Sequence, residues 1–381
     1  MTLAARPIIP EGRYAGRLSR AVAAAERAGL AAALIGVGSD LRYLTGYAAM
    51  PLERLTVLIL RPGEAPVIVV PRLEQRAAEE GVRTSVEIRT WEETDDPYRL
   101  AVSGIGRSGR IALSDSMLAM HVLGIQRALG SDARYEVASS ILRDLRMRKD
   151  TEEIELLREA AHAADRVVAQ IAAGRLVGRT EADISREVRV RLVDEGHDEA
   201  TFAIVASGPS SASPHHEASD RMIHEGEPIV LDIGGTLGGY GSDITRTVWV
   251  TSGDSSMGPS DRFRDLFDVL YRAQAAATQA VRPGLPCESI DAAARSLIED
   301  AGYGEAFFHR TGHGIGLDGH EDPYLVAGNR LPLDAGMAFS VEPGIYLTGE
   351  FGARIEDIVV CGDAGPIVLN EAPRELLVVD G

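Results

Sequence analysis

The sequence is poor in cysteine, in positive charge and in long apolar runs, and each shortage excludes a class of protein. Its two cysteines, Cys287 and Cys361, are too few for a disulfide framework and form no metal-ligand pair. The formal net charge of −18 argues against nucleic acid or an anionic membrane as a partner. Neither a signal peptide nor a bilayer-spanning run is found. We therefore expect a cytoplasmic protein that binds neither membranes nor nucleic acids.

Length and local patterns predict two domains. A chain of 381 residues is long for one hydrophobic core. Over about the first 140 residues helix-like and strand-like segments alternate, which indicates an α/β domain. The segments expected there are a helix at 17–30, a strand at 32–37, a hairpin at 54–70 and a helix at 117–130. We place the boundary after residue 148, just before a charged helical pattern with Thr151 as its expected N-cap.

The second domain is predicted to contain two similar halves. Each half has a pair of long helices followed by glycine-rich strands that carry acidic residues. The helices are expected at 151–173 and 180–195 in the first half, and at 262–281 and 287–301 in the second. This arrangement indicates a domain with pseudo-twofold symmetry, and it favours a site where the two halves meet.

The segment from Phe307 to Tyr324, FFHRTGHGIGLDGHEDPY, gives the strongest functional signal. It places His309, His313 and His320 among glycines and acids. Glycine weakens both helices and strands, so these glycines indicate backbone that passes close to another group. Histidine is a common transition-metal ligand and a common acid or base in catalysis. The segment therefore predicts metal-binding or catalytic chemistry.

Four carboxylates interrupt strands that are otherwise apolar. Asp232 in IVLDIGG and Asp243 at the start of DITRTVWV can face each other across one hairpin. Glu342 in MAFSVEPGIYL and Glu356 in GARIED can do the same across a second hairpin. One such acid alone would ordinarily be paired or at the surface. Four buried together repel one another unless a cation compensates them. With one imidazole they suit two divalent ions, such as Mn²⁺, Co²⁺ or Zn²⁺, about 3.5–4 Å apart.

On these motifs the chain resembles the pita-bread metallopeptidases, in particular the group of Xaa-Pro dipeptidases (prolidases) and Xaa-Pro aminopeptidases. The motifs that carry the resemblance are, in chain order, SGPSSASPHH, LDIGGTLGGYGSDITRT, HRTGHGIGLDGHEDP, VEPGIY and GARIED. The resemblance covers nearly the whole length. It implies an α/β (α+β) protein with a small creatinase-like α/β N-terminal domain at 1–148. A pita-bread catalytic domain with pseudo-twofold symmetry would follow at 149–381.

The resemblance also implies the residues of the site. The five metal ligands would be Asp232, Asp243, His313, Glu342 and Glu356. The catalytic residues would be Glu342 for proton transfer, His320 for the developing oxyanion, His215 and His309 for the substrate, and Arg354 for orienting Glu356. We expect no role for His216, and His224 is expected at the surface.

The activity that the resemblance implies is hydrolysis of the Xaa-Pro peptide bond of dipeptides. A hydroxide held by two divalent ions would attack the carbonyl carbon, with Mn²⁺ expected and Co²⁺ or Zn²⁺ compatible. Glu342 would pass a proton to the prolyl nitrogen. The expected substrate is a small proline-containing peptide, and the expected assembly is a homodimer.

Alternatives remain open at this stage. An Xaa-Pro aminopeptidase, which acts on longer peptides, needs an open channel where a dipeptidase needs a carboxylate-binding group. Many prolidases carry an arginine just after HExP, but here HEDP is followed by Tyr324, and the nearest arginine is Arg330. The complete ligand set disfavours a metal-free enzyme or a non-catalytic binding protein. Asp40 and Arg54 are candidates from the N-terminal domain, although ordinary loop charges are the favoured interpretation.

Overall fold

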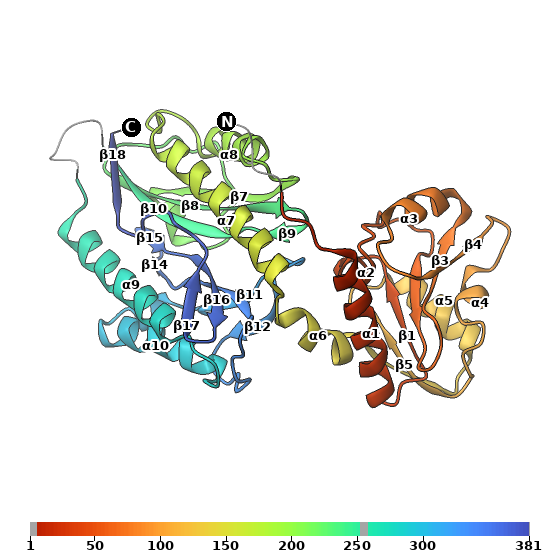
Figure 1. Ribbon diagram of the computed structural model, residues 1–381. Coiled ribbons are helices and arrows are strands. Elements are labelled where there is room, and N and C mark those ends of the chain that lie inside the picture. The colour runs from red at the N-terminus through yellow and green to blue at the C-terminus, as the bar shows by residue number, and fades with distance from the viewer. Residues whose placement is uncertain (1–5, 252–257, 381) are drawn as a thin grey trace. The chain divides into compact units, whose positions relative to one another are not determined.

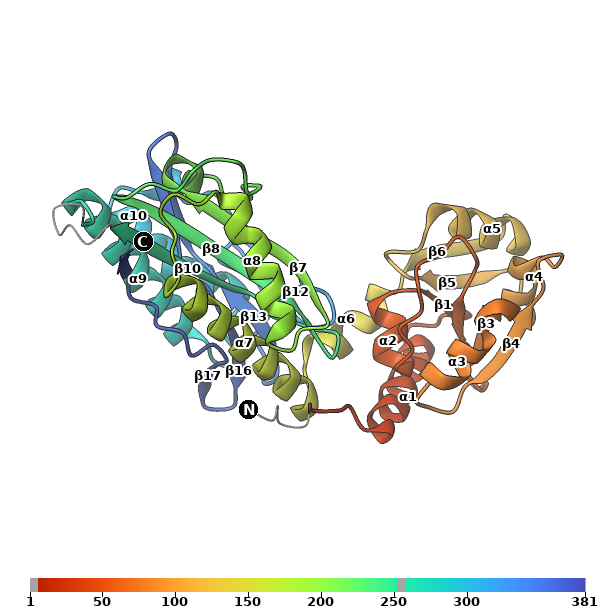
Figure 2. The same ribbon diagram turned by 90° about the horizontal axis from the view of Figure 1, so that it is seen from above.

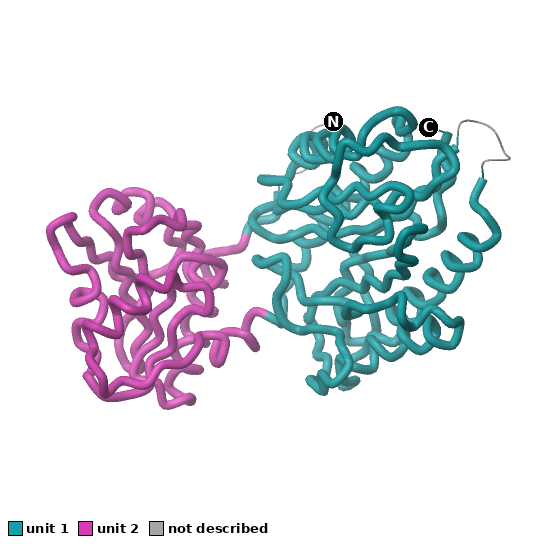
Figure 3. Tube along the Cα trace, turned by 180° about the vertical axis from the view of Figure 1, so that it is seen from behind, with its two compact units in different colours: residues 1–8, 147–381 teal, residues 9–146 magenta. Residues whose placement is uncertain are grey.

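The computed structural model describes residues 6–251 and 258–380 (Figure 1). Contacts within the chain divide it into two compact units (Figure 3). Residues 9–146 form the smaller unit, and residues 1–8 and 147–381 are assigned to the larger one. Arg6 belongs to the larger unit, where its guanidinium lies 2.6 Å from the Asp198 carboxylate. The sequence prediction had placed the boundary after residue 148.

The smaller unit is built around a six-stranded sheet with the strand order β4-β3-β2-β1-β5-β6. Its central strand β1 pairs antiparallel with β2 and parallel with β5, and every residue of β1 is buried. The elements are α1 (Glu11–Arg27), β1 (Ala32–Gly36), α2 (Ser39–Thr45), β2 (Val57–Leu60), β3 (Val67–Pro71), η1 (Arg72–Glu74), α3 (Gln75–Gly81), β4 (Glu87–Trp91), α4 (Pro97–Ala101), β5 (Gly109–Leu113), α5 (Ala119–Leu129), β6 (Ala133–Val137) and α6 (Ser139–Met147).

The expected α/β alternation of this unit is confirmed, including the antiparallel pairing of β2 with β3. Helix ends differ from the prediction: α1 ends at Arg27 rather than residue 30, α5 covers Ala119–Leu129 rather than 117–130, and the largest difference is at the start of α1. Helix α1 begins at Glu11, directly after Pro10, whereas the sequence pattern suggested a start at residue 17. Gly12 and Gly16 lie in its first turns, and glycine lowers the helix signal of any sequence window.

The first half of the larger unit places two helices on a sheet with the order β18-β10-β8-β7 (Figure 2). One hydrophobic core joins apolar residues of α7 and α8 to those of β7, β8 and β10. Strand β8 is buried along almost its whole length because it is central in the sheet. The elements are α7 (Thr151–Ala172), α8 (Glu181–Asp194), β7 (Glu199–Ser207), η2 (Gly208–Ala212), β8 (Glu227–Leu237), β9 (Tyr240–Gly241) and β10 (Ile244–Thr251).

Helix α7 begins with a capping box, and its N-cap residue lies one position before the residue that the sequence suggested. The Asp150 carboxylate accepts a hydrogen bond from the Glu153 backbone N–H at 3.0 Å, and the Glu153 carboxylate accepts one from the Asp150 N–H at 2.9 Å. Asp150 is therefore the N-cap, and Thr151, the cap that the sequence suggested, is the first residue of the helix. Both residue types cap helices well, so the sequence alone does not choose between them.

The second half repeats the pattern with helices α9 and α10 on a sheet with the order β12-β11-β13-β16-β17. A second hydrophobic core joins these helices to the sheet. All four long helices of the larger unit lie within one residue of their expected bounds. The elements of this half are α9 (Asp261–Ala280), α10 (Cys287–Asp300), η4 (Gly304–Ala306), β11 (Gly312–Gly314), β12 (Glu321–Leu325), β13 (Ala338–Val341), β14 (Gly344–Leu347), β15 (Phe351–Arg354), β16 (Asp357–Gly362) and β17 (Gly365–Val368). The last strand, β18 (Leu377–Asp380), returns to the sheet of the first half, where it pairs with β10.

The two halves meet at an isolated β-bridge between Thr245 and Glu356. Thr245 also lies opposite Asp232 in the pairing of β8 with β10. A hairpin of each half therefore brings its acidic residues to this junction. Among the described residues, none of the helices combines the length and the apolar character needed to cross a bilayer.

Candidate metal centre and its pocket

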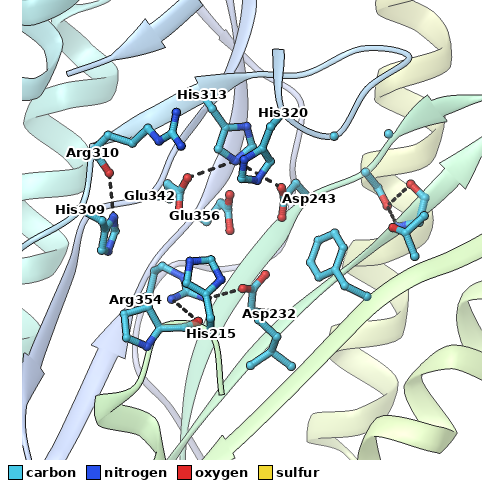
Figure 4. A pocket seen from close by; sticks show the side chains of 18 of the residues that line it. His215, Asp232, Asp243, His309, Arg310, His313, His320, Glu342, Arg354 and Glu356 are labelled. Atoms are coloured by element: carbon cyan, nitrogen blue, oxygen red, sulfur yellow. Dashed lines mark hydrogen bonds and ion pairs between the residues drawn. The ribbon is translucent and has the colours of Figure 1, made fainter. Parts of the chain in front are cut away.

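A pocket of about 420 Å³ lies in the larger unit at the junction of its two halves. Small-molecule sites commonly have volumes in this range. All nine residues that the sequence singled out line this pocket (Figure 4), namely His215, Asp232, Asp243, His309, His313, His320, Glu342, Arg354 and Glu356. They come from strands of both halves and from the loops beside them, so the predicted convergence is observed.

Three of the expected ligands already form a compact donor set. Asp243, His313 and Glu356 each offer one donor atom, and these atoms lie within 4.8 Å of one another. The His313 Nε2 atom lies 3.2 Å from a Glu342 carboxylate oxygen and 3.7 Å from one of Asp243. Asp243, His313 and Glu356 are each at most 5% exposed. Figure 4 shows the carboxylates directed toward one shared space.

The electrostatics of this donor set require positive charge. Burial raises the pKa of Asp243 and Glu356 well above the usual values, and neighbouring carboxylates raise both further. Burial likewise raises the pKa of Asp232, against the opposing charge of Arg354. One Asp232 oxygen, Oδ1, is buried and has no hydrogen-bond partner within residues 6–251 and 258–380. Buried oxygens of this kind are the ligands that divalent cations prefer, so the residues fit the expected metal.

His313 and Glu342 form the one strongly paired couple of the set. Burial alone would lower the pKa of His313, but Glu342 and Asp243 outweigh it and raise that pKa to about 9. In return, the hydrogen bond and the charge of His313 hold the pKa of Glu342 below its usual value despite burial. In the metal-free protein a protonated imidazole thus supplies part of the missing positive charge.

Arg354, from the second half, contacts residues of the first half next to the carboxylates. Its guanidinium pairs with Asp232 and donates hydrogen bonds to Thr245 Oγ1 at 3.0 Å and to the Tyr346 hydroxyl at 2.8 Å. Thr245 in turn donates a hydrogen bond of 2.6 Å to Glu356. The sequence suggested Arg354 as an orienter of Glu356, and the contacts reach that residue through Thr245.

The remaining histidines have distinct environments. His309 Nε2 lies 3.0 Å from the Tyr346 hydroxyl, and burial lowers the pKa of its imidazole. His320 stacks on His313 with ring centroids 3.7 Å apart. Partial burial, together with the charge of His313, lowers the pKa of His320 to about 4. His215 is exposed and lines the pocket.

The other two histidines considered in the sequence, His216 and His224, do not line the pocket. His216 is directed to the buried carboxylate of Glu181, with its Nε2 atom 2.7 Å from the oxygen. It therefore supports the loop that carries His215 rather than the pocket itself. His224 is exposed at the surface.

Side chains of helix α10 hold the histidine-rich segment in place through hydrogen bonds. The Asp291 carboxylate accepts hydrogen bonds from the Thr311 backbone N–H at 3.2 Å and from its hydroxyl at 2.8 Å. Arg295 donates bonds of 2.8 Å to the carbonyls of Phe307 and His309. Because both supports come from one helix, the segment that carries His309 and His313 has little freedom to shift.

Sequence reasoning missed the neutral residues that hold the ligands. Ser340 Oγ accepts a hydrogen bond from the His313 backbone N–H at 3.0 Å and donates one to Glu342 at 3.1 Å. Thr245 and Tyr346 were also missed. Their only sequence signal was their place inside the quoted motifs DITRT and VEPGIY.

The two candidates from the smaller unit form ordinary ion pairs within that unit. Asp40 lies 2.8 Å from the Arg146 guanidinium. Arg54 pairs with the Glu93 carboxylate at 2.7 Å. These contacts agree with the interpretation that the sequence favoured, namely ordinary structural charges.

Comparison with known proteins places these observations in a family context. Residues 155–363 match metallopeptidase family M24, and residues 17–148 match the creatinase/prolidase N-terminal domain. A protein of Mycobacterium bovis named "Probable dipeptidase PepE" is 48% identical over 370 residues, which covers 96% of each chain. An Xaa-Pro dipeptidase of Pyrococcus horikoshii is 31% identical over 91% of this chain and 94% of its own.

A solved structure supports the same fold. The crystal structure of dipeptidase PepE from Mycobacterium ulcerans aligns with a TM-score of 0.89 at 47% identity. The alignment covers 97% of this chain and 99% of that one. The expected architecture, a creatinase-like N-terminal domain followed by a metallopeptidase domain of mixed α/β structure, is thereby confirmed.

Proposed function

Because this chain belongs to metallopeptidase family M24, we propose that it is a metal-dependent dipeptidase that hydrolyses Xaa-Pro peptides. The observation that carries the proposal is the convergence of four carboxylates and one imidazole in a single pocket. The names of the relatives support it, since one is named a probable dipeptidase and another an Xaa-Pro dipeptidase. The proposed products are a free amino acid and proline.

The proposed metal ligands are Asp232, Asp243, His313, Glu342 and Glu356. When bound there, two divalent ions supply positive charge to these carboxylates and lower the pKa of a water molecule. We propose Mn²⁺ as the native ion, with Co²⁺ or Zn²⁺ as alternatives that suit the same donors. Arg354 and Thr245 hold Asp232 and Glu356 in place from the opposite side.

Glu342 is the proposed proton carrier. Hydrolysis adds a hydroxyl group to the carbonyl carbon and a proton to the prolyl nitrogen, which leaves as an amine. The lowered pKa of Glu342 keeps its carboxylate ionised at neutral pH, so it can accept a proton from water. Ser340 donates a hydrogen bond of 3.1 Å to this carboxylate and so fixes its orientation.

The histidines are proposed to bind and polarise the peptide. With a pKa of about 4, His320 is neutral at pH 7, so it can donate a hydrogen bond to the developing oxyanion. His309, held by the Tyr346 hydroxyl, lies beside the apolar rings of Phe307 and Phe308 and is proposed to contact the proline. His215 lines the same pocket and is proposed to contact the residue before the proline.

Metal content and substrate range test the proposal directly. Protein stripped with a chelator and reloaded with Mn²⁺ should bind about two ions per chain. It should hydrolyse Ala-Pro and Leu-Pro, and it should act on Leu-Pro-Pro far more slowly. Preference for the tripeptide would indicate an aminopeptidase instead, and failure to hydrolyse any of the three would overturn the proposal. The homodimer and the cytoplasmic location stay predictions, which light scattering and cell fractionation can check.

A further inference from the structure

One of the arginines that line the pocket has a guanidinium with no acidic partner among the described residues. Two arginines line the pocket, Arg310 and Arg354. Arg354 is fully engaged by Asp232, Thr245 and Tyr346. Within the described part of the chain, the Arg310 guanidinium makes no hydrogen bond and no ion pair. The guanidinium instead lies over an aromatic ring, with its Cζ 4.5 Å from the ring centroid of Tyr324.

The backbone of Arg310 is held in place, whereas its guanidinium has no ion-pair partner among the described residues. Arg310 lies between His309 and Thr311, on the segment that helix α10 holds through Asp291 and Arg295. Stacking on Tyr324 restrains the guanidinium plane and leaves its N–H groups at the edge available for an acceptor. Figure 4 shows the side chain on the same side of the pocket as His313 and His320.

We propose that Arg310 binds the free carboxylate at the C-terminus of a dipeptide substrate and thereby makes the enzyme prefer dipeptides. This inference rests on the proposed function, because it assigns the part of the substrate that distinguishes a dipeptide from a longer chain. Four carboxylates also line the pocket, and the second arginine, Arg354, is paired with one of them, so a substrate carboxylate needs a cationic partner of its own there. A restrained, unpaired guanidinium is the group best suited to overcome that repulsion, since its two parallel N–H donors match a carboxylate.

The size of the effect follows from the chemistry of the contact. A hydrogen bond to a charged group contributes enough binding energy that its loss weakens binding about tenfold to a hundredfold. The contact concerns binding rather than the reacting bond, so its loss should raise KM more than it lowers kcat. A substrate whose carboxylate is replaced by a neutral amide should not depend on Arg310.

The test compares Leu-Pro with Leu-Pro amide in the Mn²⁺-loaded enzyme. Wild type should prefer Leu-Pro. The Arg310→Met variant should raise KM for Leu-Pro by about tenfold to a hundredfold and leave the kinetics with the amide within about twofold. The matched control is Arg330→Met, because Arg330 is exposed and lies 3.8 Å from Glu288; it should leave both substrates unaffected.

The outcomes separate the two proposals. If wild type hydrolyses neither compound, the proposed function fails and this inference fails with it. If wild type hydrolyses Leu-Pro but the Arg310→Met variant keeps the same preference over the amide, only the role of Arg310 is overturned. Should that variant not fold, as judged by circular dichroism, Arg310→Lys carries the test. Lysine keeps the positive charge but lacks the two parallel N–H donors of a guanidinium. The KM of the Arg310→Lys variant should therefore rise for Leu-Pro and not for Leu-Pro amide.

Discussion

At the scale of single residues, the site depends on how Glu342 is held. Its carboxylate lies 3.2 Å from His313 Nε2 and accepts a hydrogen bond from Ser340. Burial raises the pKa of Glu342, but the hydrogen bond and charge of His313 outweigh it and favour the charged form, which is the form that can accept a proton. Glu342 is also one of the proposed metal ligands, so a test of its catalytic role has to separate proton transfer from ion binding.

Glu342→Gln makes that separation. Glutamine has the same size and keeps one oxygen that can ligate a metal ion, but it has no charge and cannot accept the proton. We expect kcat with Leu-Pro to fall by about 10²- to 10⁴-fold. Elemental analysis of the same sample should still find bound Mn²⁺. The exposed Glu350, which pairs with Arg262, provides the matched Glu→Gln control. Near-full turnover by the Glu342 variant with its ions in place would contradict the proton-carrier role.

The charged site residues could be predicted from the sequence, whereas their neutral partners could not. An acid within an apolar strand is an energetic anomaly that a reader of the sequence can see, as at Asp232. Thr245 and Ser340 are unremarkable in their strands, and their importance arises only from the partners that folding brings within 3.1 Å. The charged Arg310 was not singled out in the sequence, because its position in the pocket and the absence of a charged partner within the described residues are known only from the structure.

At the scale of elements, one buried carboxylate joins helix α8, strand β7 and the loop that carries His215. Glu181 accepts hydrogen bonds from Ser207 and Ser219 and contacts His216 at 2.7 Å. Its side chain has no exposed surface. Burial raises the pKa of Glu181, but the bonds from Ser219, His216 and Ser207 outweigh it and bring the pKa to about 2.

This lowered pKa makes part of the stability acid-sensitive. A carboxyl whose pKa is depressed by folding stabilises the protein above its unfolded-state pKa. For Glu181 the contribution is complete above about pH 4.5 and is lost as the pH falls toward 2. Glu181→Gln should lower the free energy of unfolding at neutral pH by about 2 kcal/mol. Urea melts at pH 7 and at about pH 3 should show a smaller difference between variant and wild type at the lower pH.

The exposed Glu225 is the matched control for that experiment. Glu225→Gln should leave the melts unchanged at both values of pH. An equal loss of stability by Glu181→Gln at both values would contradict the assignment, because the effect would then not involve the ionised form.

Element positions were more predictable than element ends. The apolar periodicity located all four long helices of the larger unit to within one residue. The N-cap of α7 was placed at Thr151 instead of Asp150, since both side chains can accept the same bond. The predicted start of helix α1 was too late, because glycines lower the helix propensity of its first turns. Packing, which the local sequence does not show, supplies most of the stability of such a helix.

At the scale of the whole molecule, the metal-free protein should depend on pH through its unbalanced acids. The pKa of His313 is raised to about 9, so the stability that its protonated form contributes is complete below pH 6.5 and is lost as the pH rises through 9. The raised pKa values of Asp243 and Glu356 act in the same direction, since ionising these carboxyls without a cation is unfavourable.

Chelator-treated protein should therefore melt at a lower temperature at about pH 8 than at pH 6.5. Addition of Mn²⁺ should raise the melting temperature more at the higher pH, because metal ligands must be deprotonated. Differential scanning fluorimetry measures both shifts. His224→Gln, at an exposed histidine, should behave as wild type. A melting temperature of the metal-free protein that does not change over this range would contradict the account.

The division of the larger unit into two related halves was visible in the sequence as a repeated order of helices and acidic strands. The contact between the two halves could not be predicted from the sequence. The bridge between Thr245 and Glu356 joins residues that are distant in the chain, and no local sequence pattern indicates such a pairing.

That junction has a consequence for how the enzyme comes into being. Each half contributes only two of the four carboxylates, and the imidazole comes from the second half alone. A chain in which only one half has folded would lack part of the proposed ligand set, so we expect it not to retain both proposed ions. Metal loading would then require that both halves are assembled, and partly folded molecules would not hydrolyse peptides.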